Sequence, residues 1–255
     1  MDNIAHTLAG LALAEAGLKR RTALGTATLA IGANLPDVDA LVYLFGSGTD
    51  ALVARRGWTH GILAMALLPF ALAGAMLLWD RLVRRRRRPA LAPADFRALV
   101  LLSAVGILSH PLLDLLNIYG VRLLMPFSDR WFYGDAVFIV EPWLWIAAIP
   151  PLVMLGRGIA RRALLGLALL GIIVAAWRVG MAGADVALVL TLGTLASFGI
   201  AGAVGPTHPR RQVALGVGAW LVVEAVFVTT ASRSRAAVRR AGGEGTLSAA
   251  AITPT

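Results

Sequence analysis

A histidine and an aspartate stand four residues apart near the end of a long apolar run, in the segment LSHPLLD that spans residues 108–114. Positions i and i+4 share one face of an α-helix, so His110 and Asp114 can point at one ion or at each other. Ionisable side chains within membrane segments are costly and default to a functional hypothesis. Alone, the pair is equally compatible with a hydrogen bond that only fixes helix packing.

Three further segments carry side chains of the same kind. RGWTHG, residues 56–61, contains His60 at the start of an apolar run, and AHTLAG, residues 5–10, contains His6. LPDVD, residues 35–39, contains Asp37 and Asp39, which share a side of the chain in an extended or turn segment but diverge on a regular helix. Each has a simpler alternative: an interfacial histidine, or two carboxylates that favour a helix N-terminus after proline.

Taken together, these residues predict a metal centre. Histidine nitrogen with carboxylate oxygen suits zinc, manganese or iron, and the absence of cysteine excludes thiolate ligands. Six candidates exceed the three or four ligands of one catalytic ion, so two ions are plausible. A carboxylate that is not a ligand, Asp39 or Asp135, could take a proton. The predicted ligands are His6, Asp37, Asp39, His60, His110 and Asp114.

The elements that must position these residues are membrane helices. Of the 255 residues, 58% are hydrophobic and only 15% are charged, and the mean hydropathy is +0.75. Because a spanning helix needs roughly 20 apolar residues, we expect an all-α, polytopic bundle of about six spanning helices after two shorter helices near 4–18 and 22–34. The predicted spans are about 59–79, 96–117, 137–156, 163–180, 184–204 and 212–231.

The net charge of +10 reflects arginines between the apolar runs rather than a nucleic-acid surface, since no folded basic module accompanies them. Cytoplasmic loops are rich in Lys and Arg. The cluster Arg84 to Arg88 is therefore expected to face the cytoplasm and anionic lipid head groups of a bacterial inner membrane. With that cluster inside, all six predicted ligands fall at the outer face.

Composition divides the chain into three parts. Residues 1–156 carry the predicted metal site, residues 157–231 supply additional transmembrane helices, and residues 232–255 form a basic tail rich in small residues that we expect to be disordered.

From His6 to about Trp143 the chain resembles the bacterial inner-membrane metal-dependent hydrolases of the YdjM type. The resemblance is carried by the N-terminal histidine, LPDVD, RGWTHG, SHPLLD and the following NIYGVRLLMPFSDRWFYGD, whereas the helices after about 156 match only in being hydrophobic. It implies metal-assisted hydrolysis, with the six residues as ligands or their close neighbours. Glu141 departs from the pattern, because aspartate is expected there.

The loop from about 118 to 136 suggests a substrate. It contains arginines and aromatic residues; arginine binds phosphate in a bidentate manner, and aromatic residues suit the head-group zone. We therefore expect Arg56, Arg122 and Arg130 to bind an ester or phosphoester of a lipid-like substrate, which metal-activated water would hydrolyse. Two alternatives stay open: a metal transporter or sensor, for which Glu224 is the conspicuous acid in the late helices, and a cluster that serves only packing.

Overall fold

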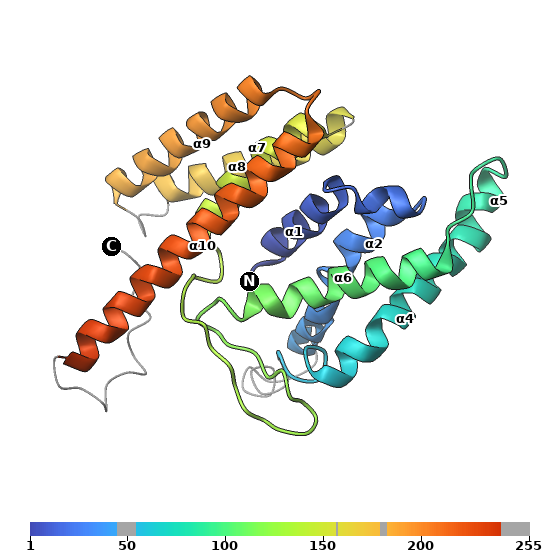
Figure 1. Ribbon diagram of the computed structural model, residues 1–255, viewed down its shortest axis with the longest axis horizontal. Helices are drawn as coiled ribbons and strands as arrows, with labels where there is room; N and C mark the ends of the chain where they lie inside the picture. The colour runs from blue at the N-terminus through green and yellow to red at the C-terminus, as the bar shows by residue number, and fades with distance from the viewer. Residues whose placement is uncertain (45–54, 157, 179–182, 241–255) are drawn as a thin grey trace. The chain divides into compact units, whose positions relative to one another are not determined.

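The computed structural model describes residues 1–44, 55–156, 158–178 and 183–240 (Figure 1). These residues form helices joined by loops, and within them the only β-structure is two isolated bridges. The all-α prediction is therefore confirmed. The elements in chain order are α1 (Asn3–Glu15), η1 (Leu18–Arg21), α2 (Gly25–Gly32), η2 (Leu35–Leu44), α4 (Ile62–Trp79), η3 (Asp80–Arg84), α5 (Arg85–Arg87), α6 (Phe96–Asp114), α7 (Pro142–Leu155), α8 (Ile159–Arg178), α9 (Ala184–Val204) and α10 (Pro209–Arg240).

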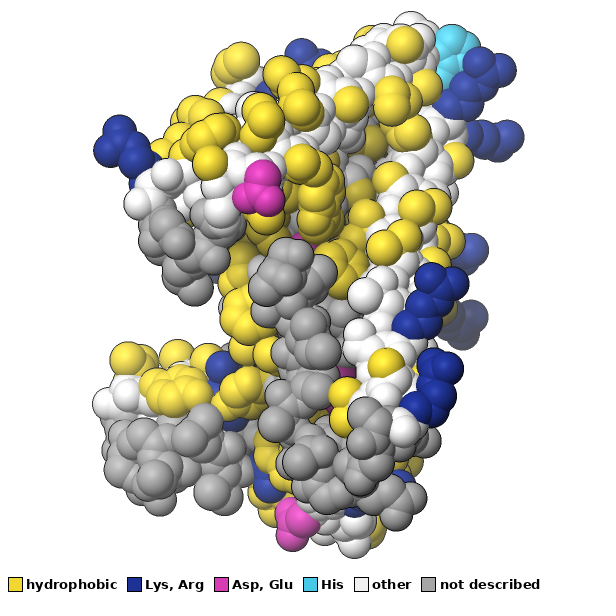
Figure 2. All heavy atoms as spheres, turned by 90° about the vertical axis from the view of Figure 1, so that its left-hand side faces the viewer, with side chains coloured by type: hydrophobic (Ala, Val, Ile, Leu, Met, Phe, Trp, Pro, Cys, Tyr) yellow, Lys and Arg dark blue, Asp and Glu magenta, His cyan; other side chains and the backbone are white. Residues whose placement is uncertain are grey.

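Five helices of the described chain are long and apolar enough to cross a membrane: the continuous segment Ile62–Arg87, α6, α8, α9 and the segment Pro209–Val238 of α10. The remaining predicted span, 137–156, corresponds to α7, an apolar helix of only 14 residues that begins at Pro142. Figure 2 shows hydrophobic side chains over much of the displayed surface, with Lys and Arg in separate patches. This surface is typical of helices that contact lipid.

The described chain divides into two compact units. Unit 1 comprises residues 1–139 and 227–240, and unit 2 comprises residues 140–226. In unit 2, α7 packs against α8 and α9, so this helix groups with the later helices rather than with the metal-site segment 1–156. Residues 232–240 continue α10 as helix, which corrects the predicted start of the disordered tail; residues 241–255 lie outside the described residues.

In unit 1, α6 is the central helix, and both α2 and α4 pack along it. Asp95 caps its start by accepting a hydrogen bond from the Ala98 amide, which fixes where the helix begins. The crossing with α2 is close because Gly32 and Gly106 face each other: a Cβ on Gly106 would lie 3.0 Å from the Leu29 carbonyl oxygen. Small residues at this crossing let the two backbones approach closely.

The two short helices predicted near the N-terminus are present as α1 and α2. Asp2 caps α1 by accepting hydrogen bonds from the amides of Ile4 and Ala5, which sets the position of His6 in the first turn that follows. Beyond α2, the LPDVD segment forms the start of the 3₁₀ helix η2. At three residues per turn, positions two apart are not aligned, so Asp37 faces Nε2 of His60 whereas Asp39 faces Nδ1 of the same ring.

Candidate metal centre

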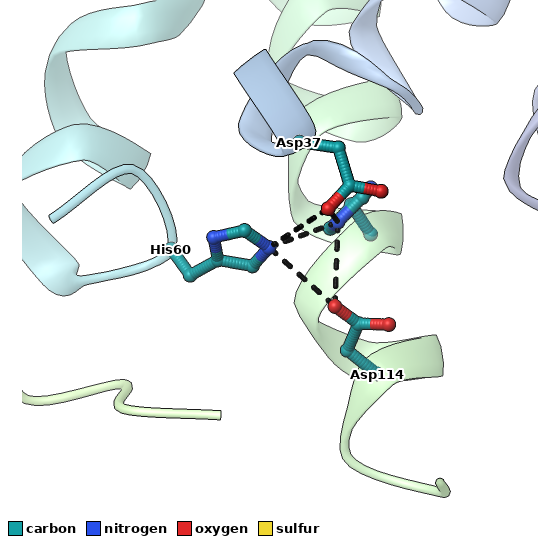
Figure 3. A group of neighbouring side chains, drawn as sticks. Asp37, His60 and Asp114 are labelled. Carbon is teal, nitrogen blue, oxygen red and sulfur yellow. Dashed lines mark hydrogen bonds and ion pairs between the residues drawn. The ribbon is translucent and has the colours of Figure 1, made fainter. Parts of the chain in front are cut away.

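Four side chains that are far apart in the sequence meet in unit 1. Asp37 comes from η2, His60 from the turn before α4, and His110 and Asp114 from the end of α6; all four are buried. Each offers one ligand atom, and these atoms all lie within 4.8 Å of one another. Figure 3 shows Asp37, His60 and Asp114 pointing toward a common centre. The structure thus brings four of the six predicted ligands together.

The two histidine nitrogens lie close to each other and to both carboxylates. His60 Nε2 lies 3.0 Å from His110 Nε2. Asp37 Oδ1 lies 3.8 Å from His60 Nε2 and 3.7 Å from His110 Nε2, and Asp114 Oδ2 lies 3.4 Å from each of the same two nitrogens. Ligands about 2.0–2.1 Å from a tetrahedral ion stand about 3.3 Å from each other. The five distances that involve a histidine nitrogen are therefore near the spacing that a four-coordinate ion requires.

Both imidazole rings are held by their other nitrogen. His110 Nδ1 lies 2.7 Å from the Ala33 carbonyl oxygen, to which it can only donate. His60 Nδ1 lies 3.4 Å from Asp39 Oδ2 and 2.9 Å from Thr59 Oγ1. A proton on each Nδ1 leaves the lone pair of Nε2 directed into the cluster, as in the carboxylate–histidine and carbonyl–histidine pairs that orient metal ligands.

The two oxygens of Asp114 have different surroundings. Oδ1 accepts a hydrogen bond from Asn117 Nδ2 at 3.2 Å. It also lies 3.3 Å from Arg56 Nη2 and contacts the amino group of Met1. Oδ2 is buried and has no hydrogen-bond partner among the described residues, although it faces both histidine rings. A buried carboxylate oxygen without a donor is costly. A divalent cation at the centre would satisfy it, so the donor set of two nitrogens and two oxygens fits zinc, manganese or iron.

The two remaining predicted ligands lie beside the cluster rather than in it. The ring of His6 stacks on the ring of His110 with 3.7 Å between centroids, and its Nε2 lies 3.3 Å from Asp114 Oδ1. Burial first, and then interaction with the neighbouring His110 and Arg56, hold the pKa of His6 well below its usual range, so the ring is neutral, the form that binds metal.

Asp39 lies behind His60. Its Oδ2 accepts hydrogen bonds from the Arg56 amide at 2.7 Å and from Thr59 Oγ1 at 3.0 Å. Burial alone would raise the pKa of Asp39, but these bonds and the one to His60 outweigh it and lower the pKa. The carboxylate is therefore ionised at neutral pH and orients the His60 ring.

Of the three arginines predicted to bind substrate, Arg56 is the one that contacts the cluster. It is buried and donates from Nη1 to Asn117 Oδ1 at 3.0 Å and to the Gly120 carbonyl oxygen at 3.2 Å. Arg122 donates to the Arg55 carbonyl oxygen at 3.2 Å, and its guanidinium lies over the Trp131 ring. Arg130 is exposed and lies over the Phe132 ring.

Asp135, the second predicted proton acceptor, is placed elsewhere. Its carboxylate lies 3.5 Å from Arg235 Nη1, and Arg235 also donates to the Gly134 carbonyl oxygen at 3.1 Å. No described contact joins Asp135 to the histidines. Glu141, at the position where aspartate was expected, caps α7 by accepting from the Trp143 amide at 3.4 Å.

Two participants were missed in the sequence. Asn117 bridges Arg56 and Asp114, and its place three residues after Asp114, in the turn that follows α6, is the signal that could have found it. Arg55 donates to Asp37 Oδ1 at 2.9 Å and lies 3.5 Å from Asp39 Oδ1. It precedes RGWTHG directly, but nothing in its own sequence context distinguishes it from a loop arginine.

Comparison with known proteins identifies the family of this chain. The model of a family described as "YdjM inner membrane protein" matches residues 1–187, which is well over half of the chain. The chain belongs to the YdjM inner membrane protein family. The match includes α7 and α8, so it extends beyond the region around Trp143 to which the sequence motifs are confined. With its long apolar helices, the protein is a multi-pass inner membrane protein.

One curated relative is the Bacillus subtilis (strain 168) protein named "Uncharacterized protein YfhP". It is 28% identical over 123 residues, which covers 48% of this chain and 33% of that protein. The chain thus matches about a third of the relative's length. No solved structure matches significantly.

Proposed function

We propose that this protein is a membrane-embedded, metal-dependent hydrolase that acts on an ester or phosphoester of a lipid-like substrate. The observation that carries the proposal is the pair of Nε2 atoms on His60 and His110, 3.0 Å apart with both Nδ1 atoms already engaged. Two lone pairs directed at each other repel unless a cation lies between them. The buried Asp114 Oδ2 without a donor supports the same cation.

Asp37, His60, His110 and Asp114 would hold the ion, with His6 as a neighbouring donor. A divalent ion there supplies Lewis acidity: it lowers the pKa of water toward ~7 and stabilises negative charge that develops on oxygen. Zinc is the proposed ion, and the four clustered atoms account for one; a second ion stays a prediction.

Neighbouring residues hold the four proposed ligands in their positions. Asp39 and the Ala33 carbonyl orient the two rings, and Arg56 together with Asn117 holds Asp114 Oδ1, so that Oδ2 points inward. Of the two predicted proton acceptors, Asp39 is the one joined to the cluster by described contacts, and its Oδ1 accepts no hydrogen bond there. We assign the proton-accepting role to Asp39.

A lipid is the proposed substrate because the centre lies at the end of a spanning helix, next to a loop with arginine and aromatic side chains. The arginine cluster Arg84–Arg88 would contact anionic head groups at the cytoplasmic face of the membrane. The metal centre would then lie at the outer face. Nucleic acid is not a proposed partner.

The proposal is tested on protein purified in detergent, by measuring bound zinc, manganese and iron and then product release from a panel of phospholipids. We expect close to one ion per chain, turnover that a chelator removes and added metal restores, and neither in His60→Ala. Metal flux into proteoliposomes without turnover of any lipid would favour the transporter instead. If the purified protein holds no metal, the His/Asp cluster serves packing only and the proposal is wrong.

A further inference from the structure

A groove of about 670 Å³ lies among α1, α2 and η2, on the side of Asp37 away from the histidines' shared centre. This volume falls within the range of about 300–1,000 Å³ that ligand sites occupy. The large aliphatic side chains that line it are Ile31, Leu35, Val38, Leu41 and Leu44. The polar side chains that line it are Asn3, Thr7, Asn34 and Asp37.

The polar side chains lie together and connect the groove to the metal centre. Asn34 Nδ2 donates to Thr7 Oγ1 at 2.9 Å, and Asn3 Nδ2 donates to Asp37 Oδ2 at 3.3 Å. The other oxygen of Asp37, Oδ1, is the atom that faces His60 and His110. One carboxylate therefore borders both spaces, so a molecule in the groove would reach the centre at the Asp37 end.

The aliphatic lining indicates what the groove holds. Ile31, Val38, Leu41 and Leu44 are between 44% and 71% exposed, because the groove is shallow and widely open. Such side chains gain by contact with another apolar group. A peptide would bring amide and carbonyl groups that need partners, which these side chains do not offer, whereas an acyl chain brings none.

We propose that the groove binds one acyl chain of a membrane lipid and so presents the lipid's ester or phosphoester at Asp37. The inference rests on the proposed function for the bond that is cleaved, but not for the binding itself. The side chains of Asn3, Thr7 and Asn34 lie beside Asp37, so the groove is polar at the end where the acyl chain would meet its head group. A substrate without a long apolar chain would leave the groove unfilled.

The test uses the full-length protein in lipid nanodiscs that contain phosphatidylglycerol with a diazirine at the end of one acyl chain. After illumination, cross-linked peptides are identified by mass spectrometry. We expect labelling to concentrate in residues 30–44. Ala40→Trp fills the groove and should lower that labelling about tenfold, the loss expected when roughly two methylenes no longer find a buried place.

Ala66→Trp is the matched control, because Ala66 is exposed on α4 and does not line the groove. It should label as the wild type does. Leu41→Asn is a second test that adds no bulk, and it should lower labelling in the same direction. Two results would overturn the acyl-chain site. One is labelling of α4, α8 and α9 that is as strong as labelling of residues 30–44, and the other is labelling that stays unchanged in both groove variants.

His60→Ala separates this inference from the hydrolase proposal. The variant should lose metal and turnover while residues 30–44 are labelled as before, because the groove does not depend on the ion. Groove-specific labelling of a wild-type protein that hydrolyses no lipid would support the binding site and contradict the hydrolase. Turnover without groove-specific labelling would do the reverse.

Discussion

His60 Nε2 and His110 Nε2 lie 3.0 Å apart, although fifty residues separate them in the chain. The turn before α4 supplies one ring and the end of α6 supplies the other, and the packing of α4 along α6 brings them together. Each ring is fixed by a partner on Nδ1 that differs in kind, a carboxylate for His60 and a backbone carbonyl for His110. Because the partner of His60 is a side chain and the partner of His110 is backbone, a substitution at Asp39 can remove the support of one ring and leave that of the other.

Replacing either histidine by alanine should remove most of the bound metal, because it leaves only three of the four clustered donors. We expect His60→Ala and His110→Ala each to lower metal affinity by more than the ~10–100-fold that loss of an outer-shell partner causes. The double variant should be little worse than either single, since ligands of one site act as a unit. The measurement is metal content after dialysis against a weak chelator.

His208→Ala is the control for these variants. His208 is exposed, and its ring contacts Thr207. Its replacement should leave metal content unchanged. Full occupancy in both His60→Ala and His110→Ala would show that the pair serves packing.

Asp39→Asn tests whether Asp39 orients His60 rather than binding the ion itself. Asparagine keeps the size of the side chain but weakens the acceptor for His60 Nδ1, so metal affinity should fall by about 10–100-fold without being abolished. Asp37→Asn, at a clustered position, should cost more. The comparison is made by competitive titration with a metal indicator. Equal losses in the two variants would contradict the division between Asp37 and Asp39.

The sequence predicts the helices and the convergence of the site well, because hydrophobic length and arginine position are strong signals in a membrane protein. It does not separate Asp37 from Asp39, since that depends on how η2 winds after Pro36. Nor does it predict that Arg56 is buried against Asp114, because an arginine in a loop has no local pattern that reports its partner. The end of α10 was missed for a related reason: small and basic residues after 231 are compatible with either helix or coil.

The side of the membrane that the centre faces is tested with single cysteines, which the cysteine-free chain makes simple. Ser128→Cys, in the loop after the metal helix, should react with a membrane-impermeant thiol reagent in intact cells whose outer membrane is permeabilised. Arg86→Cys, exposed in the arginine cluster, should react only after lysis. The opposite pattern would place the centre at the cytoplasmic face and reverse the assignment of Arg84–Arg88.

The close crossing of α2 and α6 should affect metal binding, although neither glycine at the crossing is a proposed ligand. A Cβ on Gly106 would lie 3.0 Å from the Leu29 carbonyl oxygen and 3.3 Å from the Ala33 amide nitrogen, so a larger side chain must push α2 away. Because the Ala33 carbonyl holds His110 Nδ1, that shift would also free the ring.

We therefore expect Gly106→Val to destabilise the protein by about 1–3 kcal/mol through overpacking and to weaken metal binding, with Gly106→Ala intermediate. Gly74→Val in α4 is the matched control, because a Cβ on Gly74 meets nothing within 4 Å. Thermal unfolding in detergent gives the stability, and metal content gives the second readout. If Gly106→Val and Gly74→Val unfold at the same temperature and hold the same metal, the crossing does not position His110, and the ring must be held by His60 and the ion alone.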